Sequence, residues 1–340
     1  MAKSKISATE LLAQVPTALF PIALGLAGLG GAFQAAAARF ESALAYDLGV
    51  ALIFVAAAVL VLDAFLYLGK YLRAHEHVKA DFGNATKANL IAPAFMATMV
   101  IGGALAPVSA VGLWLWAGAT VAHLFMLLQY VGRWVTISHD ASDLNPTWFL
   151  PAAGIMTASM TAPELVPDPP VFFIFATGFS LWLILLPLVV RRAIFEPALP
   201  PPLRPSLFIF AAPFGLAANS FMVMVPDIHP LVPAILAFGG AFFILALLAR
   251  PRFIAAAGMS LAWWGTTFPV ATVATSLLKL SAQSGSAFET YLGLATLVFG
   301  VACVALAIAA TFRVARNTYL GAIDVAEAEI AVMRGQVGEK

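Results

Sequence analysis

Ionisable side chains are rare in the long apolar stretches of this sequence, so each one found there is a candidate functional group. Asp63 lies inside such a stretch, and Lys70 follows two helical turns later on the same face. Burying a carboxyl group in hydrocarbon is costly. We expect Asp63 either to contact a polar partner on a neighbouring helix or to take part in proton transfer or gating. His123 is expected to form an interhelical hydrogen bond.

Residue combinations for catalysis or metal binding are weak in this chain. His75 and His77 are two residues apart, a spacing that does not place two side chains on one helix face around a metal ion. The single cysteine, Cys303, lies in an apolar run and provides neither a disulfide framework nor a thiolate cluster. No nucleophile–base constellation, phosphate-binding loop or pair of intramembrane carboxylates is visible. We therefore expect no enzyme activity, cofactor or metal site, and the net charge of +1 does not indicate nucleic-acid binding.

An aromatic ring directly before a proline is the most distinctive candidate feature. The segment TTFPVATVA, residues 266–274, places Phe268 before Pro269 in the middle of an apolar run. A proline inside a helix removes a backbone hydrogen bond and bends the helix. A ring at such a bend can project toward the axis of a helix bundle and close a narrow path, although ordinary packing is an equal alternative. Phe20 precedes Pro21 in the same way and is the second candidate.

The elements that position these residues are membrane-spanning helices. The chain is 62% hydrophobic and 10% charged, and its mean hydropathy is +0.94. Apolar runs of about 20 residues recur along it, and each can cross about 30 Å of hydrocarbon. We expect an all-α protein with a single transmembrane domain over residues 1–340, its helices lying within about 14–312 and the ends 1–13 and 313–340 in the cytoplasm. The ten predicted spans are residues 14–38, 46–70, 88–107, 109–132, 147–163, 170–190, 205–225, 230–249, 258–279 and 287–312.

Charge in the connections predicts the orientation of these spans. Basic or mixed connections alternate with connections that are nearly free of Lys and Arg, such as PELVPDPP and SAQSGSAFET. With both termini in the cytoplasm, all of the 18 Lys and Arg except Arg39 and Lys279 fall on the cytoplasmic side. Such an excess of cytoplasmic Lys and Arg is the usual signature of membrane topology. We therefore predict ten spans with both termini in the cytoplasm.

A proline recurs well inside each odd-numbered span and is followed by small residues. Even-numbered spans have no central proline, so the repeating unit is a helical hairpin with one kinked and one straight member. A bend frees carbonyl groups that lipid cannot satisfy, so the bends should face protein or a water-filled cavity. We predict five parallel hairpins with the kinked helices inside, around a central pore, although membrane helices also tolerate proline without such a role. The five pore-shaping prolines are Pro21, Pro93, Pro151, Pro213 and Pro269.

Charge is almost absent from the five inner helices. Their polar side chains are mainly hydroxyls and an amide, so the predicted path is neutral and suits weak binding and fast transit. For each hydroxyl, a hydrogen bond to its own helix backbone is the alternative interpretation. The candidate pore-lining polar residues are Thr98, Thr157, Asn219, Ser220 and Thr267.

Three segments resemble the tellurite-resistance/dicarboxylate transporter family, which includes TehA-like bacterial proteins, fungal malate and sulfite transporters, and the slow-type anion channels of plant guard cells. AWWGTTFPVAT in the ninth span resembles the family's W-W/A-x-x-F-P/G signature. LPPPLRPSLFIFAAPFGLAA is similar to its segment before the seventh span, and VPTALFPIALGLAGLGGAF to its first helix. The likeness covers nearly the whole chain. Pro21 departs from the pattern, because glycine often occupies that place.

The resemblance implies ten helices in five quasi-symmetric hairpins, a pore through each protomer of a homotrimer, and permeation by small inorganic or organic anions. It also implies that Phe268 occludes the pore. We therefore expect an anion channel, or a channel-like transporter, embedded in the lipid of the plasma membrane, here the bacterial inner membrane. The alternative is a coupled transporter or exporter of dicarboxylate, sulfite or tellurite, with Asp63 handling a proton. A receptor or membrane enzyme is a third alternative.

Overall fold

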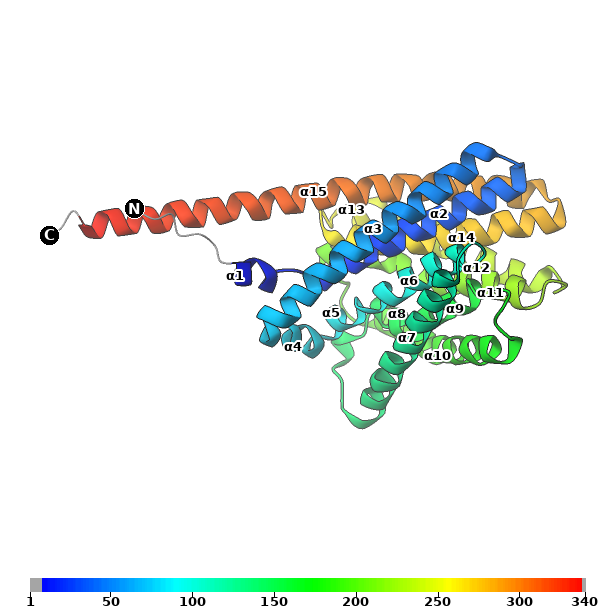
Figure 1. The fold of residues 1–340 in the computed structure, drawn as a ribbon, viewed down its shortest axis with the longest axis horizontal. Coiled ribbons are helices and arrows are strands. Elements are labelled where there is room, and N and C mark those ends of the chain that lie inside the picture. The colour runs from blue at the N-terminus through cyan, green and yellow to red at the C-terminus, as the bar shows by residue number, and fades with distance from the viewer. Residues whose placement is uncertain (1–7, 338–340) are drawn as a thin grey trace.

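The structure, a computed structural model, describes the backbone of residues 8–337 and the side chains of residues 9–317. Lys3 and Lys5, which the topology prediction uses, lie outside the described residues. Within residues 8–337 the chain is helical and has no β-strand. Figure 1 shows α1 (Ala8–Ala13) and the end of α15 (Ala287–Val337) at the left, with the turns from α2 to α3 and from α14 to α15 at the right.

Eight helices in the described range are long and apolar enough to cross a membrane, which confirms a multi-pass membrane protein. Two of the ten predicted spans do not reach that standard. The span predicted at 147–163 is divided among four short helices, and the one at 258–279 forms a 21-residue helix that its threonines and Lys279 make less apolar. The eight candidate spans are Thr17–Phe40, Ala43–Arg73, Ala85–Leu105, Ala110–Thr136, Asp168–Phe195, Pro201–Met224, Leu231–Leu248 and Ala287–Asn317.

Five elements pack against one another in chain order and close a ring. α2 contacts α6, α6 contacts α9, α9 contacts α11, α11 contacts α14, and α14 returns to α2. Each is also packed against the helix that follows it, namely α3, α7, α10, α12 or α15. The bounds of the ring elements are Phe20–Phe40 for α2, Ala92–Leu105 for α6, Met156–Met160 for α9, Ala212–Met224 for α11 and Trp264–Ser284 for α14.

The ring elements are more buried than the helices that follow them. In the span that contains α2, 67% of the most apolar window is buried, against 17% in α3. Large side chains on the second set point outward; Phe65 on α3 and Trp114 on α7 are examples of exposed aromatic residues. These helices therefore form an outer layer with an apolar exterior, which suits lipid. Their bounds are Ala43–Arg73 for α3, Ala110–Thr136 for α7, Asp168–Phe195 for α10 and Leu231–Leu248 for α12.

Short helices complete the chain, mostly before the ring elements. A 3₁₀ helix often leads directly into an α-helix, as η1 (Thr17–Leu19) does into α2. The others are α4 (His75–Gly83), α5 (Ala85–Asn89), η2 (Ala141–Asp143), η3 (Pro146–Trp148), α8 (Phe149–Ala152), η4 (Ala153–Ile155), η5 (Pro201–Ala211), α13 (Pro251–Ala255) and η6 (Leu261–Trp263).

The repeated prolines lie mostly at helix starts rather than inside continuous helices. Pro21, Pro93 and Pro213 occupy the first turn of α2, α6 and α11, where the missing N–H would have no intrahelical partner. Pro151 lies in α8, directly before the 3₁₀ helix η4. Pro269 alone of the five is inside a long α-helix. The expected bends are therefore largely junctions between short helical turns and the following helix.

Close backbone approach holds α6 and α7 together. A Cβ atom added to Gly112 would lie 2.3 Å from the backbone nitrogen of Ala106, and one added to Gly102 would lie 2.6 Å from that of Trp116. We expect Gly112→Ala to lower the free energy of unfolding by about 1–3 kcal/mol, since backbone atoms cannot move aside cheaply. Thermal unfolding of the purified protein measures this. Gly118→Ala on the same helix, which faces open space, is the matched control and should not destabilise.

Candidate functional site: two cavities on one axis

A cavity of about 250 Å³ lies near the beginning of α14, and we call it the Trp264 cavity. Its wall is mostly apolar, and its polar members are four hydroxyl residues, of which Ser206 donates to the carbonyl of Leu203 at 2.6 Å. At one side of the cavity, Asn89 donates a side-chain hydrogen bond to Thr147, and Asn145 donates one to Thr86. The Thr147 hydroxyl in turn donates to Oδ1 of Asn145. The wall includes Pro21 and Leu24 of α2, Pro93 of α6, Leu150 of α8, Ile209 of η5, and Phe268 and Pro269 of α14.

A second cavity, of about 350 Å³, lies further along the same helices, and we call it the Lys279 cavity. Its wall is built from α2, α3, α6, α9 and α14 with the residues after α9. The wall includes Gly28, Gly31 and Gln34 of α2, Val100 of α6, Thr161, and Thr272, Thr275 and Lys279 of α14.

The two cavities follow one another along a common axis. On α2 the wall of the first reaches Leu24 and that of the second begins at Ala27. On α14 the change occurs between Pro269 and Thr272, again within about one helical turn. The ring of helices therefore encloses two hollows with a short closed region between them.

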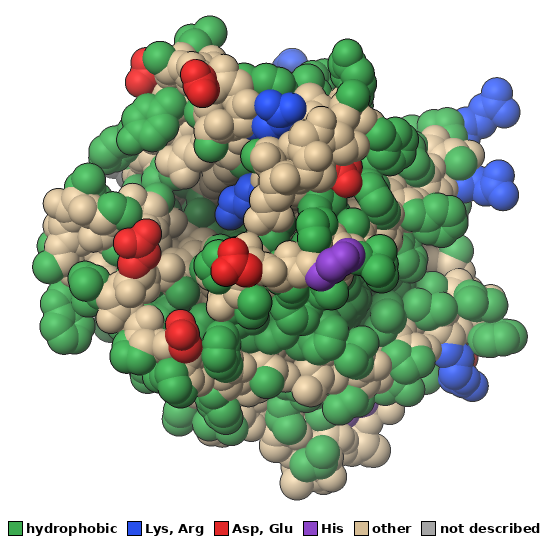
Figure 2. Space-filling model, turned by 90° about the vertical axis from the view of Figure 1, so that its right-hand side faces the viewer, with side chains coloured by type: hydrophobic (Ala, Val, Ile, Leu, Met, Phe, Trp, Pro, Cys, Tyr) green, Lys and Arg blue, Asp and Glu red, His purple; other side chains and the backbone are tan. Residues whose placement is uncertain are grey.

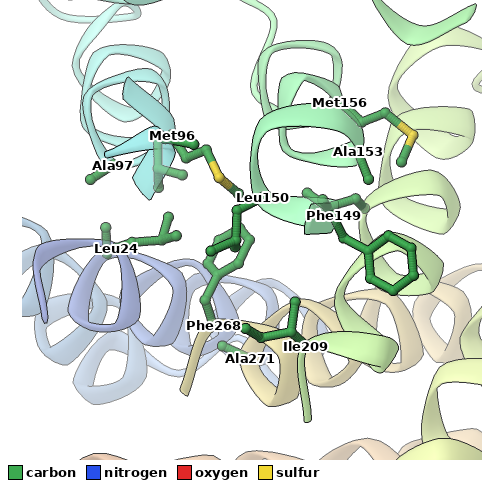
Figure 3. Close-up of a cluster of buried hydrophobic side chains, with 14 of the residues drawn as sticks. Leu24, Met96, Ala97, Phe149, Leu150, Ala153, Met156, Ile209, Phe268 and Ala271 are labelled. Carbon is green, nitrogen blue, oxygen red and sulfur yellow. The ribbon is translucent and has the colours of Figure 1, made fainter. Parts of the chain in front are cut away.

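Phe268 lies at that closed region. Its side chain is 3% exposed and belongs to the wall of the Trp264 cavity. Figure 3 shows the ring rising from α14 toward Leu150. A Cβ atom added to Gly28, which is on the wall of the Lys279 cavity, would lie 2.6 Å from Cδ2 of the ring. The ring thus contacts the backbone of α2 at the level where one cavity ends and the next begins.

The second aromatic candidate lies elsewhere. Phe20 packs edge-on against Tyr67 of α3, with 5.4 Å between the ring centroids, and is not on the wall of either cavity. Pro21, Pro93 and Pro269 are on the wall of the Trp264 cavity. Pro151 and Pro213 are buried but lie on neither wall.

The five predicted pore-lining polar residues are on neither wall. Asn219 donates from Nδ2 to the carbonyls of Gly215 at 2.8 Å and Thr272 at 2.9 Å, and Ser220 donates to the carbonyl of Met156 at 3.2 Å. They tie α11 to α14 and α9. Thr98 and Thr267 donate to carbonyls of their own helices, and the Thr157 hydroxyl is buried without a partner among the described residues.

Other polar residues of α14 line the Lys279 cavity instead. Thr272, Thr275 and Lys279 follow Phe268 at intervals of four, three and four residues, which places all four on one face of the helix. That periodicity was present in the sequence, and extending a stripe from Phe268 would have identified them. Gln34 faces the same cavity from α2.

The threonine hydroxyls on this wall are already engaged as donors. Thr272 donates to the carbonyl of Pro269 at 2.9 Å, Thr275 to that of Ala271 at 2.8 Å, and Thr161 to that of Thr157 at 2.8 Å. Since a hydroxyl has one hydrogen to donate, these groups present only oxygen lone pairs to the cavity.

Asp63 and Lys70 do not act as a pair. Asp63 is 4% exposed, lies on neither wall, and its Oδ2 has no hydrogen-bond partner among the described residues. Lys70 instead forms an ion pair with Asp81 of α4, with 2.5 Å between Nζ and Oδ2, and donates to the carbonyl of Val15 at 2.8 Å. Sequence reasoning missed Asp81.

The histidines also find structural positions. Nε2 of His123 on α7 lies 2.9 Å from the carbonyl oxygen of Pro151, which is the interhelical hydrogen bond expected of it. His75 and His77 lie at the start of α4. Within the described residues, no three His, Cys, Asp or Glu side chains are grouped to hold a metal ion.

Comparison with known proteins adds a family match over the same helices. Residues 14–314 match the model of the SLAC1 family, described as voltage-dependent anion channel. The chain is 26% identical to the S-type anion channel SLAH2 of Arabidopsis thaliana over 231 residues, which are 66% of this chain and 44% of that protein. It is 23% identical to the guard cell S-type anion channel SLAC1 of the same plant, over 65% of this chain and 41% of that protein. The chain thus spans less than half the length of these relatives.

Proposed function

Because the chain belongs to the SLAC1 family of voltage-dependent anion channels, which its match over residues 14–314 shows, we propose that it conducts small anions through the axis of its own helix ring. The observation that carries this proposal is the stacking of two cavities along α2, α6 and α14. A scaffold protein has no need of aligned hollows inside its most buried helices. A channel needs them, with a barrier that controls passage between them.

Phe268 is the barrier in this proposal. Its ring stands where the cavities meet, packs against Gly28 of the neighbouring helix α2, and presents no group that could replace the hydration of an ion. A narrow apolar constriction excludes water and therefore blocks ions. Gly28 supports this assignment, because a side chain at that position would occupy the space that the ring now fills.

The family match supports an anion as the permeant ion. Backbone carbonyls freed near prolines attract cations, so anion preference must have another source. The basic connections at the α1 end of the molecule raise the local concentration of anions there. They include Arg191, Arg192, Arg204, Arg250 and Arg252.

The membrane arrangement is part of the same proposal. We place ten crossings in five hairpins, with the four short helices from η3 to α9 and the less apolar α14 as the two crossings beyond the eight apolar spans. Both ends of the chain are then cytoplasmic, and the membrane is the bacterial inner membrane. The exposed apolar faces of α3, α7 and α10 are available to lipid or to the other subunits of a homotrimer.

Coupled transport of a dicarboxylate, sulfite or tellurite oxyanion is the alternative function. Proton coupling requires a titratable group that contacts the transported ion or controls access to it. Among the described residues, no Asp, Glu or His side chain is on either cavity wall, and Asp63 is on neither. This arrangement favours passive conduction.

Flux into liposomes that contain the purified protein distinguishes the two functions. We expect chloride and nitrate to move down their gradients at equal pH on both sides, at a low rate that an imposed pH gradient leaves unchanged. Empty liposomes are the control. Movement that requires a pH gradient, or movement of malate or sulfite in preference to nitrate, would support coupled transport instead.

A further inference from the structure

Lys279 is unusual among the charged residues that the structure describes, because it alone contributes to a cavity wall on the helix axis. It follows Phe268 by eleven residues on α14, which is about 16 Å along the helix at 1.5 Å per residue. The Lys279 cavity thus has a cationic group well separated from the apolar barrier.

No acidic side chain accounts for this lysine. Within the described residues, no carboxylate oxygen lies within 4.0 Å of its Nζ, and Nζ has no hydrogen-bond partner. Carboxylates are nonetheless plentiful at the end of the molecule opposite α1, where Lys279 lies. Figure 2 looks onto that end and shows several of them, with a Lys or Arg side chain at the edge of a hollow. They include Glu41, Asp47, Glu164, Asp168, Asp227 and Glu289. A lysine with a structural role would be expected to pair with one of them.

The other cation at this end of the molecule is differently placed. Arg39 donates from Nε to the hydroxyl of Ser281 at 3.2 Å and from Nη2 to that of Thr290 at 3.4 Å, and it is not on the cavity wall. Arg39 therefore holds the ends of α2, α14 and α15 together, whereas the Lys279 ammonium has no such task.

Lys279 and Gln34 are the free N–H donors on this wall. The hydroxyls of Thr161, Thr272 and Thr275 already donate to backbone carbonyls. The Gln34 amide is half-buried and has no hydrogen bond to another described residue. An ammonium and an amide that face a cavity whose wall has hydroxyl acceptors but no carboxylate among the described residues are suited to bind an anion.

We propose that Lys279, with the amide of Gln34, forms an anion-binding site in the Lys279 cavity, separated from the Trp264 cavity by Phe268. The site takes a small monovalent anion of the size of chloride or nitrate, since one ammonium neutralises one negative charge and a dianion would retain its second charge in a low-dielectric space. The proposal rests on the proposed function for placing this cavity on the path of the ion.

The test measures anion binding by the purified full-length protein without requiring an open pore. Sodium nitrate is titrated against sodium gluconate at constant ionic strength, and the midpoint of thermal unfolding is recorded. We expect the midpoint of the wild type to rise saturably with nitrate by a few degrees. Lys279→Gln should weaken the apparent affinity by about tenfold or more, whereas Lys279→Arg should retain binding. Arg39→Gln, which removes the same charge from the same end of the molecule, is the matched control and should still bind.

The outcomes separate this site from the proposed function. A Lys279→Gln protein that titrates like the wild type, or a wild type without a nitrate-dependent shift, overturns the site and leaves the channel proposal intact if Phe268→Ala conducts. A wild type that binds nitrate through Lys279, while Phe268→Ala carries no current, retains the site and overturns the channel.

Discussion

Phe268→Ala should raise the anion current by a factor on the order of 10 to 100, measured in oocytes with chloride and then nitrate as the charge carrier. The ring lies at the level where the Trp264 and Lys279 cavities meet, so we expect its truncation to join them. Each reduction of the barrier by about 1.4 kcal/mol increases the rate of passage tenfold. The wild type, with the ring in place, should carry a small current.

Phe208→Ala is the matched control for that experiment. Phe208 is 2% exposed, comparable with 3% for Phe268, and lies on neither cavity wall. Both substitutions remove a buried ring and should lower the free energy of unfolding by about 3–5 kcal/mol if the surroundings do not collapse. Only the truncation of Phe268 should raise the current. Equal currents from the two variants at equal surface expression would mean that loosened packing, not removal of a barrier, opens the path.

Asp81→Asn is expected to lower the free energy of unfolding by about 3–5 kcal/mol. The side chains of Lys70 and Asp81 are 3% and 5% exposed, so the substitution leaves a buried ammonium without its counter-charge. Lys70 also donates to the carbonyl of Val15, just before η1 and α2. Loss of the ion pair should therefore loosen the start of α2, the helix against which the Phe268 ring packs. Thermal unfolding of the purified variant measures it.

Two further variants make the Asp81 experiment specific. Glu76→Gln removes the partner of Lys79 in an exposed ion pair of the same short helix, and it should have no measurable effect. The double substitution Lys70→Met with Asp81→Leu removes both charges and should recover much of the loss, because no unpaired charge remains buried. If Asp81→Asn is as stable as Glu76→Gln, the buried pair does not hold these segments together.

The membrane-spanning helices were largely predictable, because the hydrophobicity of the segment decides where they form. A run of about 20 apolar residues has few alternatives to a buried or lipid-facing helix. The break at 147–163 was harder to foresee. Pro151 and Gly154 interrupt the backbone there, and Gly154 also leaves room for Met96, since a Cβ atom would lie 2.7 Å from the sulfur. That requirement depends on a helix more than fifty residues away.

The polar residues of the site were less predictable than its aromatic residue. Phe268 could be selected because it precedes a proline, which is a local signal. Asn219 and Ser220 have the residue types of a pore wall, but they hydrogen-bond to the backbone of α14 and α9 between the helices. Residue type does not reveal which side of a buried helix faces an axis. The spacing of Thr272, Thr275 and Lys279 from Phe268 does, once one wall residue is known.

The Lys70–Asp81 pair was hidden for a different reason. Helical periodicity related Lys70 to Asp63 on the same helix, but Asp81 lies on α4, which folds back after α3 ends at Arg73. A contact made across such a reversal has no fixed spacing in the sequence. Buried charges near the ends of helices therefore require the fold before their partners can be assigned.

The reversal potential of the Phe268→Ala current under a tenfold sodium chloride gradient tests the central claim most directly. We expect the current to reverse close to the chloride equilibrium potential. When nitrate replaces chloride, the reversal potential should shift in the same direction under the same gradient. A reversal potential near that of sodium would contradict anion selectivity. No current at verified surface expression would contradict the claim that the two cavities are one ion path closed by the Phe268 ring.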